Sequence, residues 1–550
     1  MIERELKLSV PPRFRAPSLA GLMEGLIAVP LEPLTLRATY YDTPDLRLIR
    51  WGCTFRHRSE EGWTVKLPSV GDSSMLARPE LRFEGSPRHP PAEALDLLRA
   101  YVRRTPLEVV ARLRTLRLTV ELRDASGAKL AELVDDEVSV IDGHRVAGRF
   151  RELEIELADG AADDGDALLA AVVSRLEAEG ATVAEPTPKL VRAVGPRALE
   201  APEVDPVDVD ESATGGEVVT AALARSVARF MHRDPGVVLG EDPEDVHQAR
   251  VALRRLRSDL RTFSPLLEDE RRDHLRSEAS WLGRLLGDVR DAEVLHEALS
   301  READTLPPGD GEALRAMIGR LQAARTRARA RLLEARRSER FLDLCEEMVE
   351  TARAPALTEL ANEPADVALP PLLARPWRRL RRSAQRLDAD SPDAELHELR
   401  ILAKRLRYAS ETMAPAAGKR ARRLARGSAR LQDVLGLHQD ATIAQAWLRE
   451  AAESATPGGA FAAGEVYERQ ALEADRARRR WPKAWRRLER SADRGWLKRA
   501  RFADGGLPRE EPSDEERPQE EPPHEPVVSV TPAAPDAATN GDAPSPPATT

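Results

Sequence analysis

The N-terminal sequence places charged residues at every second position of several short segments. Side chains two residues apart on a β-strand point to the same face of a sheet, so each segment forms one charged stripe. A single stripe is typical of a solvent-exposed strand, but several together indicate a sheet that encloses a polar interior. The charged positions are Glu3, Glu5 and Lys7, then Arg56 and Arg58, then Lys66, then Glu152, Glu154 and Glu156.

A polar interior of this kind needs opposed charges or bound ions, because an isolated buried charge is strongly unfavourable. Carboxylates on one wall predict divalent cations, and basic groups on another wall predict a polyanion. Mg²⁺ binds a few carboxylate oxygens and completes its coordination shell with waters and substrate phosphates. A triphosphate with magnesium would therefore balance the charges of both walls. The sequence contains no HExxH, GxSxG or glycine-rich phosphate loop that would favour a different chemistry.

These motifs resemble a known superfamily. The ExExK sequence at residues 3–7, followed by YYDTP at residues 40–44, is similar to the CYTH, or triphosphate tunnel metalloenzyme, proteins over residues 1–195. The resemblance implies an α+β fold with an eight-stranded antiparallel tunnel barrel. Members of that superfamily cleave triphosphates with Mg²⁺ or Mn²⁺ or, in some branches, cyclise ATP. This chain has Pro-Lys-Leu at 188–190 where the family usually has a Ser-Lys-Tyr-like sequence, so we expect different contacts there.

The resemblance also implies roles for individual residues. Glu3 and Glu5 are the implied metal ligands, and with Lys7 they are the implied catalytic residues. The late metal-binding glutamates lie among Glu152, Glu154 and Glu156, with their register open by two residues. Either Asp135 or Asp136 matches a further acidic position of the family, and a solvated turn is an equal alternative. The implied substrate-binding residues are Arg56, Arg58, Lys66, Lys189, and one of Arg112 and Arg114.

A second group of basic residues follows helical spacing further along the chain. Residues at i, i+3, i+7 and i+10 lie on one face of a helix, and residues 247–257 and 397–407 both show this pattern at an offset of 150 residues. The pairs Leu-Gly at 286–287 and 435–436, with the aspartates at 291 and 440, repeat at an offset of 149. The repeat predicts a duplicated helical bundle with pseudo-twofold symmetry and a shared basic groove.

The repeated stripes resemble the CHAD family over residues 217–505. The resemblance implies an all-α domain that binds inorganic polyphosphate through basic helix faces. Histidine could alternatively ligate a metal, but one histidine per stripe is too few for a site, which favours phosphate hydrogen bonding or core packing. The implied polyphosphate contacts are His247, Arg250, Arg254, Arg255, Arg257, His397, Arg400, Lys404, Arg405 and Arg407.

The remaining sequence defines the boundaries between these parts. We predict the tunnel domain at 1–195, a Pro-rich acidic linker at 196–216, the helical domain at 217–507, and a disordered acidic Pro-rich tail at 508–550. Within the first domain, helical spacing also occurs at 16–28, 92–103 and 165–179. The helical domain carries 54 basic and 46 acidic residues and the tail 2 and 10. This contrast suggests that the tail contacts the basic domain and competes with polyphosphate.

Composition restricts the functional classes. No apolar run is long enough for a membrane span, and residues 1–5 lack the basic-then-apolar order of a secretory signal, which predicts a cytoplasmic protein, with polyphosphate granules as a second expected location. Two isolated cysteines exclude a disulfide framework. Aromatic residues make up 4% and none interleaves the basic stripes, which argues against nucleic acid as a partner.

The sequence thus predicts a metal-dependent triphosphatase that acts on inorganic triphosphate or a related triphosphate, joined to a polyphosphate-binding domain. A non-catalytic polyphosphate scaffold or granule protein is one alternative. An adenylate cyclase of the same superfamily is another.

Overall fold

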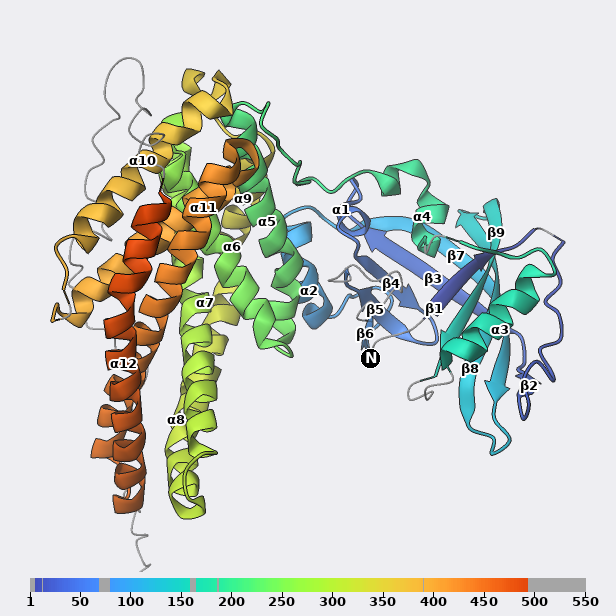
Figure 1. The fold of residues 1–550 in the computed structure, drawn as a ribbon. Helices are drawn as coiled ribbons and strands as arrows, with labels where there is room; N and C mark the ends of the chain where they lie inside the picture. Colours follow the sequence, from blue (N-terminus) through green and yellow to red (C-terminus); the bar gives the residue numbers. More distant parts are fainter. Residues whose placement is uncertain are drawn as a thin grey trace, which may run out of the picture.

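The computed structural model describes residues 5–11, 13–68, 80–158, 165–184, 187–388 and 390–492, and shows a sheet domain beside a bundle of long helices (Figure 1). The sheet has ten strands, all paired antiparallel, in the order β10-β1-β9-β8-β7-β3-β4-β5-β6, and β2 pairs with β7. The strands are β1 Glu5–Ser9, β2 Ile27–Pro30, β3 Leu34–Asp42, β4 Thr54–Arg58, β5 Gly62–Lys66, β6 Glu80–Phe83, β7 Glu108–Arg123, β8 Lys129–Asp142, β9 Arg145–Leu157 and β10 Thr182–Val183.

The antiparallel tunnel predicted from the sequence is confirmed in its architecture. Among the described residues no ladder joins β6 to β10, so the sheet is tunnel-like but not closed, and it contains ten strands where eight were predicted. Short helices accompany the sheet: α1 Arg47–Arg50, α2 Ala92–Val102, α3 Gly165–Glu177 and α4 Lys189–Val194. They include the helices predicted near 92–103 and 165–179.

The helix predicted at 16–28 is wrong. Residues 16–26 form turns and irregular structure, and β2 begins at Ile27. Gly21 and Gly25 adopt positive φ values of 74° and 78°, which a right-handed helix does not allow. The apolar residues that produced the helical spacing still serve the core, because Leu19 and Leu26 are buried against the sheet.

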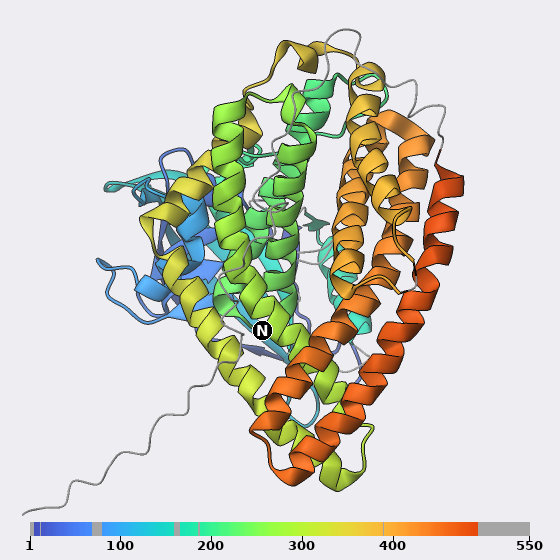
Figure 2. The same ribbon diagram turned by 90° about the vertical axis from the view of Figure 1, so that its left-hand side faces the viewer.

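The C-terminal part is an all-α bundle of α5 Gly215–Leu239, α6 Pro243–Thr262, α7 Asp269–Ala303, α8 Pro308–Arg336, α9 Glu339–Arg353, α10 Ala365–Ala384, α11 Asp393–Glu453 and α12 Pro457–Ser491 (Figures 1 and 2). The backbone of α11 leaves the helical conformation at Gly418, with φ 67° and ψ −151°, so α11 consists of two helices across a kink. The order α5, α6, α7 and α8 is therefore repeated by α10, the two parts of α11, and α12. This arrangement confirms the predicted duplication.

The two domains share one apolar core. On β4 and β5 the alternate residues Phe55, Trp63 and Val65 are fully buried and belong to the same cluster as residues of α5. The rings of Phe55 and Trp63 stack with centroids 4.7 Å apart. The segment predicted as a linker also packs, because Val204 is 2% exposed and Arg103 donates two hydrogen bonds to Glu203. In the described part of the chain, no helix is long and apolar enough to span a bilayer.

A buried ion pair joins α5 to α8 near this shared core. Arg336 Nε donates to Asp234 Oδ1 at 2.9 Å, Arg336 Nη2 donates to the other carboxylate oxygen, and both side chains are 2% exposed. Removing one partner leaves a buried charge without compensation. We expect Arg336→Met to lower the free energy of unfolding of the helical domain by about 3–5 kcal/mol, measured by urea titration with helical circular dichroism.

The matched control is Arg331→Met, which breaks an exposed pair with Asp288 and should cost less than about 1 kcal/mol. The double variant Asp234→Leu/Arg336→Met should lose less stability than Arg336→Met alone, since neither charge remains buried. Equal effects of Arg336→Met and Arg331→Met would contradict this account.

Candidate functional site

Strand pairing places a continuous set of charged residues on one face of the sheet. Opposite residues in neighbouring strands share a face, and the register pairs Lys7 with Glu154, Glu152 with Asp136, and Asp136 with Arg117. Across β4, β5 and β6 the same face carries further basic and acidic groups, with β3 pairing β4 to β7. These are Arg56, Arg58, Lys66, Glu80 and Arg82.

Three carboxylates on β8 and β9 converge on a single cation, and we call them the acidic wall. Lys189 Nζ lies 2.9 Å from an oxygen of Asp136, 2.8 Å from Glu152 and 2.9 Å from Glu154. The carboxylates are 0%, 3% and 8% exposed. Lys189 reaches them because it is the first residue of α4, which follows Pro188. The ammonium group therefore occupies a position that three buried carboxylates surround.

Other cations also contact the acidic wall. Lys7 Nζ lies 2.6 Å from Glu154, Arg117 makes a bidentate pair with Asp136, and Arg192 Nη1 lies 3.0 Å from Glu152. Burial by itself would lower the pKa of Lys189, but Glu154, Glu152 and Asp136 raise it above its usual value. Burial would raise the pKa of Glu154, and Lys189 and Lys7 instead hold it well below its usual value. Both partners stay charged.

The acidic wall has the donor chemistry of a divalent cation site. Magnesium binds carboxylate oxygens, and three of them already surround one positive charge here. The described residues contain no group of three or more acidic, histidine or cysteine side chains that could hold a metal ion, and the Lys189 ammonium lies between these carboxylates. Glu3 and the side chain of Glu5 lie outside the described residues, although the backbone of Glu5 pairs with Glu156 beside the wall.

The opposite part of the same face is basic, and we call Arg56, Arg58 and Lys66 the basic wall. Glu80 neutralises part of it, with Lys66 Nζ at 2.6 Å and Arg56 Nη2 at 3.7 Å. Arg58 pairs with Glu61 at 2.8 Å. Burial would raise the pKa of Glu80, but Lys66 and Arg56 lower it to about 2. Burial and the neighbouring Arg56 lower the pKa of Arg58. Glu80 thus neutralises both Lys66 and Arg56 on this face of the sheet.

The structure separates residues that the sequence left as alternatives. Arg112 and Arg114 are exposed and pair with Thr39 and Arg37, so they lie on the outer face, away from the acidic and basic walls. The basic group that β7 contributes to the inner face is Arg117, which the sequence analysis missed. Asp136 faces inward, whereas Asp135 accepts a hydrogen bond from Arg151 at 2.8 Å. Alternate residues of β7 face inward, but which set does so depends on how β7 pairs with the neighbouring strands. The sequence alone does not give that pairing, so it could not identify Arg117.

The structure also shows which of the three glutamates of β9 belong to the acidic wall. Glu152 and Glu154 form the acidic wall with Asp136, while Glu156 lies one step further along β9, opposite Glu5 and Glu132. Two glutamates that sequence reasoning did not single out, Glu80 and Glu61, neutralise the basic wall. Neither position follows the family motif, so only the three-dimensional structure reveals them.

A second candidate site lies where the two basic stripes of the helical domain meet. Arg254 Nε on α6 donates to the hydroxyl of Tyr408 on α11 at 2.7 Å. Arg250 pairs with Asp291 at 3.2 Å and packs over Gly287, whose missing Cβ would lie 3.4 Å from Arg250 Nε. The pseudo-symmetric Arg400 packs over Gly436 in the same way, at 3.7 Å. The repeated Leu-Gly pairs therefore provide room for the two arginines.

Lys404 lies at the centre of this group, which we call the basic groove. Burial lowers its pKa, and the neighbouring Arg254, Arg400 and Arg250 lower it further, to about 7, against the opposing effect of Asp291. Burial, with Arg290, Arg254 and Arg250, likewise lowers the pKa of His247 despite Glu244. The structure thus brings five of the predicted contacts together around one place: His247, Arg250, Arg254, Arg400 and Lys404.

The other predicted contacts lie at its margins. Arg255 and Arg407 both bind Glu411, at 2.6 Å and 2.7 Å, so their charges are shared with one carboxylate. His397 contacts the side chain of Gln439 at 2.7 Å, which fits a hydrogen-bonding role. Arg257 and Arg405 are half-buried on α6 and α11. The groove therefore has a strongly cationic centre and a partly neutralised margin.

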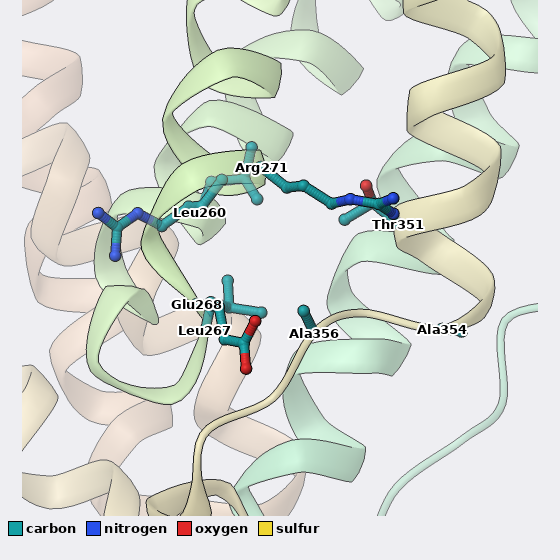
Figure 3. Close-up of a pocket in the computed structure, with 8 residues that line it drawn as sticks. Leu260, Leu267, Glu268, Arg271, Thr351, Ala354 and Ala356 are labelled. Atoms are coloured by element: carbon teal, nitrogen blue, oxygen red, sulfur yellow. The ribbon is translucent and has the colours of Figure 1, made fainter.

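A pocket elsewhere contains none of the predicted site residues. It lies between the ends of α6 and α9 and the start of α7, and is lined by apolar groups with Glu268 and Arg271 at its side (Figure 3). Its lining includes Leu260, Leu267 and Ala356. It contributes no catalytic group to either candidate site.

Comparison with known proteins agrees with the two-part organisation. Residues 1–184 match the CYTH domain family and residues 221–449 match the CHAD domain family. Two uncharacterized proteins of Mycobacterium tuberculosis, from strains CDC 1551 / Oshkosh and ATCC 25618 / H37Rv, are each 31% identical over 535 residues. The alignment covers 89% of this chain and 97% of each relative. The similarity therefore extends over both domains in one chain.

Solved structures resemble the separate parts. PptA from Streptomyces chartreusis is 25% identical over 50% of this chain and 100% of its own, with a TM-score of 0.43. The CHAD domain from the plant Ricinus communis is 27% identical over 52% of this chain and 95% of its own, with a TM-score of 0.43. A putative adenylate cyclase from Bacillus halodurans is 19% identical over 35% of this chain and 96% of its own, with a TM-score of 0.25. With TM-scores below 0.5, these likenesses say nothing about chemistry.

The Glu80 contacts predict a specific acid sensitivity of the sheet domain. Because the pKa of Glu80 is lowered from 4.5 to about 2, its stabilising effect is complete above about pH 4.5 and disappears as the pH falls toward 2. We expect Glu80→Gln to reduce the free energy of unfolding by up to about 3 kcal/mol at pH 7 and by much less at pH 3. Urea titrations followed by tryptophan fluorescence would measure the difference. Glu84→Gln, at an exposed position two residues beyond Arg82, is the control, and an equal pH dependence in both variants would contradict the argument.

Proposed function

Because this chain belongs to the family of proteins that join an N-terminal CYTH domain to a C-terminal CHAD domain, we propose that its sheet domain hydrolyses inorganic triphosphate or a related triphosphate with Mg²⁺ or Mn²⁺, and that its helical domain binds polyphosphate. The observation that supports the hydrolase most directly is that the acidic and basic walls share one face of the sheet. Three buried carboxylates surround one cation there, and Arg56, Arg58 and Lys66 lie on the same face.

The acidic wall supplies the residues that would hold the metal. Glu152, Glu154 and Asp136 are the described ligands in this proposal, with Glu3 and Glu5 as the further ligands that the ExExK motif implies. When bound, the metal neutralises phosphate oxygens and thereby assists phosphoryl transfer to water. Lys189 must withdraw from the three carboxylates, and its ammonium can then contact a phosphate. This exchange gives the lysine of Pro188-Lys189-Leu190 a role in substrate binding.

The basic wall orients the polyanion. Arginine guanidinium groups bind phosphate oxygens in a fixed, bidentate geometry, which suits Arg56 and Arg58. Lys66 adds a compact positive charge next to Arg56. Glu80 neutralises Lys66 and Arg56 in the absence of substrate, so a phosphate must compete with its carboxylate. Phosphoryl transfer depends mainly on positioning and electrostatic stabilisation, so these contacts account for most of the proposed catalysis. Lys7, already paired with Glu154, would polarise a phosphate rather than remove a proton.

The helical domain supports a separate binding role. In the basic groove, Lys404 is surrounded by Arg250, Arg254 and Arg400, and few carboxylates oppose them. A chain of phosphates would relieve this repulsion, because each unit brings a negative charge with strong acceptor oxygens. We therefore propose that the groove captures polyphosphate while the sheet domain cleaves short triphosphates. If the groove binds polyphosphate, the protein would be found in the cytoplasm where polyphosphate accumulates, including polyphosphate granules.

Phosphate release tests the hydrolase. Wild-type protein should release phosphate from inorganic triphosphate with Mg²⁺ or Mn²⁺, and Glu3→Ala/Glu5→Ala should lose the activity by a factor of about 10² to 10³, because the metal site is incomplete. Arg112→Ala/Arg114→Ala is the matched control, since both arginines lie on the outer face and their loss should change the rate less than about twofold. Release would be measured by phosphate assay.

Two other outcomes of that assay have clear meanings. If wild-type protein releases no phosphate but still binds polyphosphate, the chain acts as a scaffold and the hydrolase proposal fails. If it instead converts ATP to cyclic AMP, the alternative within the superfamily is correct.

The pKa of Lys404 tests the basic groove. Because this pKa is about 7, Lys404 loses its charge as the pH rises through 7, and polyphosphate affinity should fall by up to about tenfold between pH 6.5 and pH 8.5. Lys404→Arg keeps the charge and should make the fall in affinity smaller. Part of the fall should persist, because burial raises the pKa of Asp259 to about 7 and this carboxylate becomes negative over the same pH range. Fluorescence titration with labelled polyphosphate would measure both. Lys129→Arg on the sheet domain is the control, and an unchanged slope in Lys404→Arg would exclude this role.

A further inference from the structure

A second basic surface lies on α10, α11 and α12, beyond the kink at Gly418. In the stretches 375–386, 419–430 and 476–490, 20 residues are basic and only Glu489 is acidic. On α11 and α12 the exposed members follow i, i+4, i+7 and i+11 spacing, which lines each set along one helix face. We call these residues the terminal basic surface: Arg378 and Arg382; Lys419, Arg423, Arg426 and Arg430; and Arg479, Lys483, Arg486 and Arg490.

Packing brings the three stretches together at the end of the bundle. The rings of Trp377 on α10 and Trp485 on α12 stack with centroids 5.6 Å apart. Gly427 on α11 lies so close to α12 that a Cβ there would be 2.6 Å from Leu488 Cδ1. Arg381 on α10 approaches Glu489 on α12 at 3.8 Å. The last turns of α12 therefore contact both α10 and α11, and Figure 2 shows the red helix on the outer side of the bundle, beside the orange one.

Part of this surface is balanced by acids of α12, since Arg479 pairs with Asp475 at 2.5 Å, but for other members the described residues show no acidic partner. Within the described part of the chain, no ion pair is found for Arg382, Arg423 or Arg426, whereas the exposed arginines of α7 and α8 commonly pair with a nearby acid, as Arg331 does with Asp288. It is also distinct from the basic groove, since the two share no residue. A dense positive surface of this kind attracts an acidic partner.

We propose that the terminal basic surface binds the acidic segment 510–525 of the same chain. That segment contains eight acidic residues and one basic residue, Arg517. It begins 18 residues after Ala492, which directly follows the end of α12. Eighteen residues of chain can extend at most to roughly 60 Å, so the acidic residues are within reach of the surface from which the chain departs.

The tether makes even weak ion pairs effective. Exposed arginine–carboxylate pairs contribute only about 0.2–1 kcal/mol each, but a short linker raises the local concentration of the segment to the millimolar range. Several such pairs then suffice to keep the segment bound at low salt. Bound in this way, it neutralises the surface and limits access of other polyanions. The contact does not depend on the proposed triphosphatase activity.

Carbodiimide cross-linking of the full-length protein tests the proposal, because this reagent joins carboxylates to lysines in direct contact. The chain has only eight lysines, and two of them, Lys419 and Lys483, lie exposed on the terminal basic surface. Lys129, 2.5 Å from Glu132 in the sheet domain, provides an internal control that should always form its own cross-link. We expect peptides that join Lys419 or Lys483 to residues 510–525 in the monomer fraction.

A matched variant separates this contact from incidental coupling. In Glu510→Gln/Glu511→Gln/Glu515→Gln/Glu516→Gln, and in wild-type protein at about 0.5 M salt, these cross-links should fall at least fivefold while the Lys129–Glu132 product stays constant. The proposal is overturned if the Lys129–Glu132 product forms but neither surface lysine couples to 510–525. It is also overturned if mixed isotope-labelled chains show the cross-links only between different copies. Finally, it fails if Arg423→Gln/Arg426→Gln/Arg430→Gln weakens polyphosphate binding equally with and without residues 508–550, since the surface would then bind polyphosphate and not the acidic segment.

Discussion

Balance of buried charge is the constraint on which the sheet domain depends. Its inner face collects carboxylates on β8 and β9 and basic groups on β4 and β5, and neither set could stay buried and ionised alone. Lys189 neutralises the acidic wall, and Glu80 neutralises part of the basic wall. Each stands where the proposed metal or phosphate would bind. The same arrangement therefore stabilises the fold without ligand and prepares a site in which ligand charges can replace protein charges.

The alternation of β4 and β5 connects this site to the rest of the molecule. Arg56 and Lys66 face the interior of the sheet, while Phe55, Trp63 and Val65 face the core that is shared with α5. The same few residues therefore position the basic wall and attach the sheet to the helices. Polar contacts reinforce that attachment, since Arg104 of the sheet domain meets Glu339, Asp343 and Glu346 of α9. The orientation of the basic wall is thus fixed by packing with the helical domain.

The helical domain buries charged groups in a different way. In its basic groove the cations of α6 and α11 face one another with few acids between them, and burial together with their repulsion lowers the pKa of Lys404 to about 7. Tyr408 and Glu411 hold the arginines in place at the margin of the groove. The sheet domain balances opposite charges, whereas the groove keeps an excess of one sign. That difference matches the two proposed roles, a metal with its substrate in the sheet domain and a polyanion alone in the helical domain.

The sequence by itself determined the two domain types, because strand alternation and helical spacing are local properties of the chain, and the 150-residue offset exposed the duplication. It also located the charged stripes that carry Arg56, Glu152, Glu154, Arg254 and Lys404. It could not decide between Arg112 and Arg114, or between Asp135 and Asp136, and it did not identify Arg117, because those assignments depend on the register and on which face of each strand turns inward. The roles of Glu80 and Glu61, and the convergence of three carboxylates on Lys189, likewise follow only from the tertiary structure, since they join strands and a helix that are far apart in sequence.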